Sequence, residues 1–137
     1  MIKSVNVVYV IDKDNPEGLN NIDKDKLKSI TNNYIEHIDC TELDKFAISD
    51  RHDVFIACVQ KLAIKGTVTL KFVNLDLLAN KIEKAELTGQ QYSKLLPNIN
   101  SSWSHLEAMD AISQSSLNLH NMYYDYIYTI LKLEKTQ

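Results

Sequence analysis

Short apolar runs alternate along this chain with stretches in which apolar residues recur every three or four positions. This pattern predicts a protein of mixed strands and helices. The first run, residues 4–11, holds four valines between polar flanks and predicts a buried strand. A second short strand is predicted over residues 34–39, and a third, rich in β-branched residues, over residues 67–74. The tail, residues 117–135, predicts two more strands, which makes five in all.

The clearest helix signal lies between the second and third strands. Ser49 is positioned to cap this helix, and Gly66 is expected to end it in the left-handed conformation before the third strand leaves. Its apolar stripe consists of Val54, Phe55, Cys58, Val59 and Leu62. A more modest helix is predicted over residues 22–33, between the first two strands.

Further helices are predicted between the third strand and the tail. Two helical pieces are parted near Gly89, and a last helix begins at Ser104, because Glu107 three residues later completes a capping-box pattern. Within the tail, a tight turn is predicted near Tyr124 and Asp125. The residues that follow alternate with a period of two, as in a strand. One set is Ile127, Thr129, Leu131 and Leu133, and the other is Tyr126, Tyr128, Ile130 and Lys132.

The order of these elements predicts the fold class. Alternating strands and helices favour a mostly parallel sheet with right-handed crossovers, whereas a tight turn permits only an antiparallel pair. We therefore expect a single α/β domain over residues 1–137, with three layers. A mostly parallel five-stranded sheet would be flanked by helices and would end in an antiparallel hairpin.

Composition and charge narrow the classes of function. The formal net charge is −3 with both signs mixed along the chain, and Arg51 is the only arginine, which argues against a nucleic-acid partner. No apolar run is long enough to cross a bilayer, so no membrane partner is expected. Cys40 and Cys58 have neither metal-ligand spacing nor the density of a disulfide scaffold. We expect a reduced cytoplasmic protein without a bound metal.

Few residues are candidates for chemistry. Asp12 and Asp39 each close a predicted strand, and ligands of open α/β sheets lie at the carboxyl ends of the strands. Side-chain capping of a loop or helix explains both residues equally simply, and is favoured. The cluster of Asp50, His52 and Asp53 is interpreted as structural, because acidic residues in a first helical turn complement the helix dipole.

The stretch "IEHIDCTELDKFAISDRHDVFIACVQKLAIKGTVTL" has a strand, a loop and a helix that reaches Lys61-Leu62 and then Gly66 before another strand. It resembles the fourth strand, helix and fifth strand of the class I S-adenosylmethionine-dependent methyltransferases. The later stretch "WSHLEAMDAISQSSLNLHNMYYDYIYTILKLEK" is similar to the last helix and the sixth and seventh strands of that family. The resemblance extends from about residue 34 to the end, and helix–Gly–strand junctions are common in α/β folds.

The chain departs from this family where the methyl donor would bind. The family's first strand opens into a glycine-rich loop, which lets the donor lie against bare backbone. This chain has no Gly-x-Gly, and its only glycines are Gly18, Gly66 and Gly89. If residues 4–11 are the first strand, Asp12 would repel the donor's carboxylate. If they are the second strand, Asp12 matches the acid that binds the ribose hydroxyls, and the glycine loop is missing.

The resemblance implies which residues would surround bound molecules. Asp12, Asp39 and Cys40 would lie near the cofactor, and the substrate would meet Asn74, Asp76 and Trp103. Because the glycine loop is absent, we expect a non-catalytic methyltransferase-like domain that acts as a binding or assembly module and needs no cofactor. The alternatives are an active small enzyme that uses S-adenosylmethionine at an atypical site to methylate a small molecule or glycan, and an unrelated α/β protein.

A protein partner is also expected. If three strands of the family are reduced to one, the strand at residues 4–11 would form an edge of the sheet. Its valines are too apolar to leave an edge uncovered, since natural proteins cover or pair such edges. We therefore predict a homodimer, or another protein partner, at this strand.

Overall fold

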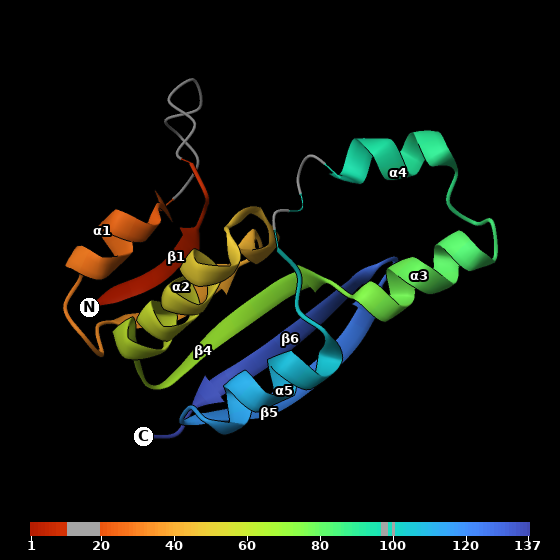
Figure 1. Ribbon diagram of the computed structural model, residues 1–137. Coiled ribbons are helices and arrows are strands. Elements are labelled where there is room, and N and C mark those ends of the chain that lie inside the picture. The colour runs from red at the N-terminus through yellow and green to blue at the C-terminus, as the bar shows by residue number, and fades with distance from the viewer. Residues whose placement is uncertain (11–19, 97–98, 100) are drawn as a thin grey trace.

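The computed structural model describes residues 1–10, 20–96, 99 and 101–137. They form one six-stranded sheet in the order β2-β1-β3-β4-β6-β5, with helices packed on it (Figure 1). The strands are β1 (Ile2–Val7), β2 (Asn21–Ile22), β3 (Ile35–Cys40), β4 (Leu62–Val73), β5 (Leu117–Asp125) and β6 (Tyr128–Lys135). The helices are α1 (Lys24–Ser29), the short 3-10 helix η1 (Leu43–Lys45), α2 (Ile48–Lys61), α3 (Leu75–Glu83), α4 (Gly89–Leu95) and α5 (His105–Ser113).

The directions of the strands confirm a mostly parallel sheet that ends in a hairpin. β2, β1, β3 and β4 pair in parallel, whereas β6 is antiparallel to both β4 and β5. The prediction of five strands is wrong by one. The two-residue strand β2 pairs with Asn6 and Val7 of β1, and a strand that short carries no periodicity by which it could be recognised. β2 rather than β1 is therefore outermost on this side.

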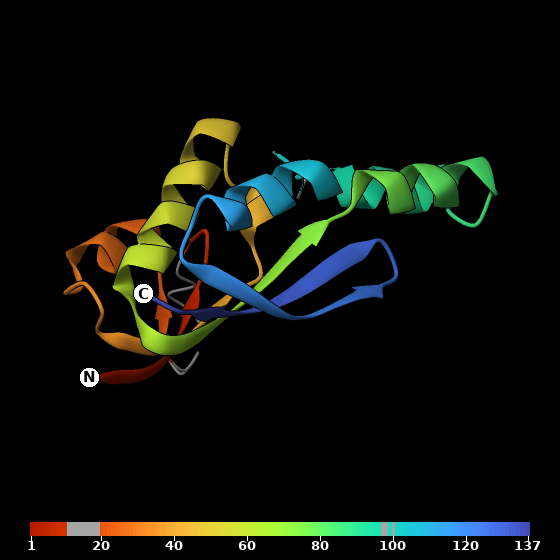
Figure 2. The same cartoon turned by 90° about the horizontal axis from the view of Figure 1, so that it is seen from below.

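The expected three-layer arrangement is wrong for the described residues, because the helices lie together on one side of the sheet (Figure 2). The alternation along β4 shows the same asymmetry. Val68, Leu70 and Phe72 face the helices and are at most 2% exposed. Thr67, in contrast, is exposed and Lys71 is half-buried. The face of β4 without helices therefore carries polar side chains that can remain in contact with water.

The core lies between the sheet and the helices. Phe55 of α2 and Phe72 of β4 both pack edge-on against Trp103, with ring centroids 5.3 and 5.6 Å away. Trp103 is only 3% exposed, although it lies in the segment before α5. Such aromatic contacts add to the burial of apolar area. A smaller apolar cluster beneath α3 and α4 is formed by Val73, Leu78, Leu87 and Ile127.

The junction between α2 and β4 differs from the prediction. The helix begins after Ala47 rather than at Ser49, and β4 starts at Leu62 directly after the helix. Gly66 does not adopt the left-handed conformation; Lys65 does, with φ 68°. Gly66 is required for a different reason, since a Cβ there would lie 2.7 Å from the carbonyl oxygen of Ala63 and 2.9 Å from that of Glu36.

The second half of the chain agrees more closely with its sequence pattern. The Ser104 side chain accepts a hydrogen bond from the Glu107 backbone N–H and caps α5, as predicted. Of the two alternating sets in the tail, Ile127, Thr129, Leu131 and Leu133 form the buried one, since each is at most 1% exposed. The hairpin turn lies slightly beyond Asp125, with Tyr126 at φ 58°. None of the described helices is long and apolar enough to span a membrane.

Candidate active-site region at the carboxyl ends of the strands

The strand order identifies the crevice in which a ligand of this fold is expected. β1 pairs with β2 on one side and with β3 on the other, so the direction of the connections reverses between β1 and β3. Open α/β sheets bind their ligands at such a switch point, outside the carboxyl ends of the strands. The residues that follow β1 and β3 therefore decide whether a cofactor can enter.

The segments that follow β1 and β3 are hydrogen-bonded to each other across this crevice. The backbone N–H of Tyr9, just after β1, donates to Oε2 of Glu42, just after β3, over 2.8 Å. The ring of Tyr9 packs edge-on against Phe46, with centroids 5.2 Å apart. Glu42 is further held by Lys45, whose Nζ lies 3.0 Å from Oε1. The predicted cofactor residue Asp12 follows in the chain but lies outside the described residues.

A small cavity of about 100 Å³ adjoins the crevice at the ends of β3 and β4. Its lining consists of Thr41, Glu42, Asp44, Lys45, Val73, Leu95, Ile99 and Tyr128. The cavity is thus polar on the β3 side and largely apolar on the other. Its volume is far smaller than the several hundred Å³ of pockets that enclose a drug-sized ligand.

Asp44 is the unusual residue of this cavity, because the residue is only 7% exposed and its carboxyl group is only partly paired. Oδ2 accepts from the backbone N–H of Val73 over 2.7 Å, whereas the buried Oδ1 has no hydrogen-bond partner among the described residues. Burial raises the pKa of Asp44 to about 6, although the Val73 N–H and the charges of Arg51 and Lys71 lower it. A buried acceptor without a partner is costly unless a ligand or water supplies a donor.

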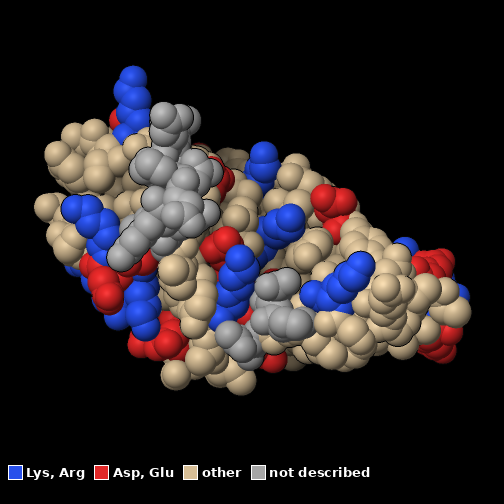
Figure 3. Space-filling view, turned by 90° about the horizontal axis from the view of Figure 1, so that it is seen from above, with Lys and Arg blue, Asp and Glu red and all other residues tan. Residues whose placement is uncertain are grey.

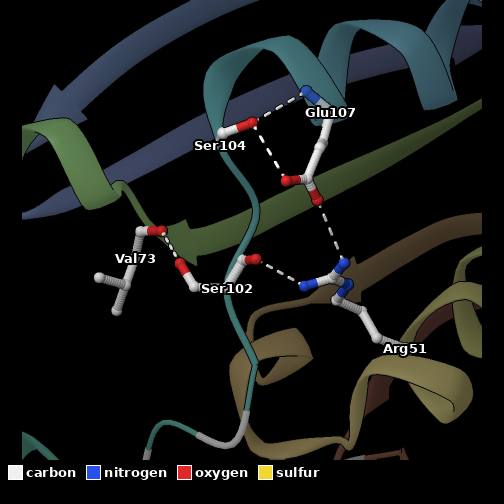
Figure 4. A network of polar contacts seen from close by, with 5 residues as sticks. All are labelled: Arg51, Val73, Ser102, Ser104 and Glu107. Atoms are coloured by element: carbon white, nitrogen blue, oxygen red, sulfur yellow. Dashed lines mark hydrogen bonds and ion pairs between the residues drawn. The ribbon is translucent and has the colours of Figure 1, made fainter.

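Arg51 holds the segment that closes this region (Figure 4). Its Nη1 donates to the carbonyl oxygen of Ser102 over 2.6 Å, and its Nη2 lies 3.5 Å from Oε2 of Glu107. The Ser102 hydroxyl donates in turn to the Val73 carbonyl oxygen over 2.7 Å. Burial lowers the pKa of Arg51, and Glu107 and Asp44 raise it. The chain's only arginine is thus part of the scaffold that fixes the end of β4.

Of the predicted cofactor residues, Asp39 and Cys40 are described, and they lie on opposite faces of the sheet. The Asp39 carboxylate lies on the face of the sheet without helices, where it bonds His37. Cys40 is fully buried on the helix side. Its thiol is hydrogen-bonded to Cys58, which together with burial raises the pKa of Cys40 well above its usual value. A thiol in that position faces the core and cannot contact a ligand at the strand ends.

The predicted substrate residues have structural partners. Asn74 caps α3 by accepting from the backbone N–H of Asp76 and Leu77, and its Nδ2 donates to Thr129 over 2.9 Å. Asp76 is exposed in the first turn of α3. Trp103 is buried in the core, as described above. Sequence reasoning missed Asp44, because a single acidic residue after a strand has the same pattern as a turn former.

Surface charge is mixed on the face seen in Figure 3, where acidic and basic side chains of the described residues are interspersed. No known family profile matches this chain, and no curated protein matches it. Solved structures do match. A SAM-dependent methyltransferase from Archaeoglobus fulgidus superposes at TM-score 0.68 with 7% identity, covering 98% of this chain and 86% of that one. The chain has a methyltransferase-like fold.

Two further matches agree with this fold. An O-methyltransferase family protein from Burkholderia thailandensis has TM-score 0.66 and 10% identity over 100% of this chain and 44% of its own. A chain from a complex that contains a methyltransferase activator of Haloferax volcanii has TM-score 0.59 and 12% identity over 94% of this chain and 65% of its own. The chain thus spans less than half of the Burkholderia protein, and identities this low show the fold alone.

Proposed function

We propose that this methyltransferase-like domain binds a small ligand without transferring a methyl group. The observation that carries the proposal is the contact between the Tyr9 N–H and the Glu42 carboxylate, which crosses the crevice at the switch point. A methyl donor of this fold needs bare backbone there, and its own carboxylate would meet the negative charge of Glu42. The sequence supplies no Gly-x-Gly that would open the space.

The adjoining cavity favours a different kind of ligand. Its volume of about 100 Å³ suits a group of a few heavy atoms rather than a nucleoside. Oδ1 of Asp44, which no group of the described residues bonds, can accept from a hydrogen-bond donor, and the carboxylate favours a positive charge. Val73, Leu95 and Ile99 supply apolar contact for a short alkyl group. A small alkylammonium group has both properties.

Two titrations test this proposal. Isothermal titration calorimetry with S-adenosylmethionine is expected to give no binding at micromolar concentrations. Thermal shift with methyl-, ethyl- and butylammonium is expected to stabilise the protein at about millimolar concentration, since binding to the folded state raises the melting temperature. Asp44→Asn should abolish that shift. Asp76→Asn, which neutralises an exposed acid of α3, is the matched control and should keep it.

Each opposite outcome has a definite meaning. Micromolar binding of S-adenosylmethionine would overturn the non-catalytic proposal and support an active small methyltransferase acting on a small molecule or glycan. Equal ammonium shifts in wild type and Asp44→Asn would show that Asp44 is no ligand site.

We also propose that the domain self-associates, through β5 rather than through the strand at residues 4–11. β5 is the last strand in the sheet order and is exposed along most of its length. Beyond its bulge, the segment 121–125 can pair antiparallel with a second copy about Tyr123, which leaves Asp125 opposite Asn121 and brings no like charges together.

Analytical ultracentrifugation tests the assembly. A dimer is expected at micromolar concentration, and Tyr123→Lys should dissociate it, because two lysines would then face each other across the two-fold axis. Leu106→Lys, at an exposed position on α5, is the control. A wild-type monomer at the highest soluble concentration would exclude this interface.

A further inference from the structure

The face of the sheet without helices carries a chain of hydrogen bonds between side chains of β3 and β4. Oδ1 of Asp39 lies 2.9 Å from Nε2 of His37, and Nδ1 of the same imidazole lies 2.7 Å from the Thr67 hydroxyl oxygen. The ammonium cavity and the switch-point crevice use none of these three residues. The function proposed above therefore does not account for this chain of hydrogen bonds.

The reactive form of this chain of hydrogen bonds has a neutral imidazole. In the tautomer with its proton on Nε2, His37 donates to the Asp39 carboxylate, which accepts. Nδ1 then has a lone pair that accepts from the Thr67 O–H. A hydroxyl bonded to the basic nitrogen of an imidazole whose other nitrogen is held by a carboxylate is the arrangement that activates a hydroxyl nucleophile.

The sheet holds this arrangement rigidly. His37 and Thr67 are direct partners across the β3–β4 pair, and Asp39 follows His37 by two residues, which returns it to the same face. Positions on paired strands are held more precisely than positions on loops. The three groups therefore need no loop closure to reach reacting geometry.

Thr67 is also accessible, because it is exposed and lines a groove of about 320 Å³ on this face. The groove is lined by His37, Thr67, Val68, Thr69, His120, Lys132, Leu133 and Glu134. Glu134 is the strand partner of Thr67 and Lys132 is the partner of Thr69, so the groove carries a negative and a positive charge. Of these two charges, the Lys132 ammonium is the one that would stabilise an oxyanion formed when a carbonyl group is attacked.

We propose that Thr67 is a nucleophile that accepts an acyl group from an activated ester or thioester. The Thr67 oxygen forms a bond to the acyl carbon, and the bond from that carbon to the leaving oxygen or sulfur breaks with its electron pair. The hydroxyl proton passes to Nδ1 of His37 and from there to the leaving group. Asp39 holds the imidazolium while it carries this proton. The products are O-acyl Thr67 and the free alcohol, phenol or thiol.

Mass spectrometry after incubation with p-nitrophenyl acetate tests the proposal. One acetyl group per chain is expected on Thr67, located by fragmentation of the peptide that contains it. Hydroxylamine separates the possible products, because it cleaves an ester on threonine but leaves an acetylated lysine intact. The labelled Thr67 peptide is therefore expected to lose its acetyl group on this treatment.

Variants separate catalysis from structure. Thr67→Val keeps the β-branched shape and should abolish the ester. His37→Gln should slow the labelling of Thr67 by about 100-fold, the usual contribution of a general base. Asp39→Asn should slow it by a smaller factor through loss of ring orientation. Thr31→Val is the matched control; Thr31 is exposed and lies outside the groove, so its loss should leave the labelling unchanged.

Two results would overturn the proposal. If the acetyl groups map only to lysines and resist hydroxylamine, Thr67 is not a nucleophile. Labelling of Thr67 at the wild-type rate in His37→Gln would likewise exclude activation by the imidazole. Asp44→Asn should label like wild type, so failure here is distinct from failure of the ammonium site.

Discussion

On the face of the sheet that the helices cover, Val68, Leu70 and Phe72 of β4 are at most 2% exposed. On the opposite face of the same strand, Thr67 is exposed and Lys71 is half-buried. The covered face stabilises the fold through apolar burial, which tolerates little change in volume. The open face contributes little to packing, so its residues are free to hold hydrogen-bonded chemistry such as that of His37 and Thr67. One strand thus serves both purposes through its period of two.

The largest effect is expected from a substitution on the face of β4 that the helices cover. Phe72→Ala removes the ring that packs on Trp103 and should lower the free energy of unfolding by about 3–5 kcal/mol. Thr69→Ala, on the open face of the same strand, should change it by less than about 1 kcal/mol. Urea denaturation followed by circular dichroism measures both. Equal losses would mean that something covers the open face in solution.

A second test concerns a polar residue on the packed side. Burial raises the pKa of Asp44 from 3.8 to about 6, so only well below pH 3.8 is it protonated in both the folded and the unfolded chain. Between pH 3.8 and 6 the unfolded chain releases this proton while the folded protein keeps it, and above pH 6 the folded protein must hold a buried charge. Since one pKa unit corresponds to about 1.4 kcal/mol, the fold loses roughly 3 kcal/mol by pH 7. Asp44→Asn should escape this loss.

Unfolding free energies at pH 4, 5, 6 and 7 check this prediction. The stability of wild type relative to Asp44→Asn should fall between pH 4 and pH 7. Asp76→Asn controls for the removal of an exposed acid. Parallel curves for wild type and Asp44→Asn would show that the Asp44 carboxyl group titrates alike in both states.

The two described glycines differ in the space available for a Cβ atom: the position of Gly66 is crowded and that of Gly89 is open. Gly66→Ala should lower the free energy of unfolding by about 1–3 kcal/mol, because its Cβ would meet two backbone oxygens within 3 Å. Gly89→Ala in the first turn of α4 has nothing within 4 Å and should be neutral or stabilise by up to about 1 kcal/mol. Thermal melts of both variants measure the difference. Equal melting temperatures would contradict the close approach of β3 and β4 at Gly66.

The smallest effect is expected on the open face. His37→Gln breaks two hydrogen bonds at a half-buried position and should change the free energy of unfolding by no more than about 1 kcal/mol. Chemical denaturation checks this value. A loss of several kcal/mol would show that the His37 bonds are needed for pairing β3 with β4.

Local pattern predicted most elements correctly where burial has a regular period. The alternation from Ile127 to Leu133 predicted the strand β6, and the Ser104–Glu107 spacing predicted the start of α5. It failed where an element is too short to show a period, as in β2. The local pattern also gave the wrong role to Gly66. The backbone of Glu36 approaches this glycine from a neighbouring strand, and residues near Gly66 in the sequence do not indicate that contact.

The sequence by itself determined that this is a mostly parallel α/β protein with a closing hairpin and without a glycine-rich donor loop. Each of those properties follows from residues close together in the chain. The tertiary structure alone decided that, among the described residues, no helix covers one face of the sheet and no group bonds Oδ1 of the buried Asp44. It also brought His37 to Thr67, thirty residues away. These properties depend on strand pairing and packing between distant segments, which no local pattern of polarity encodes.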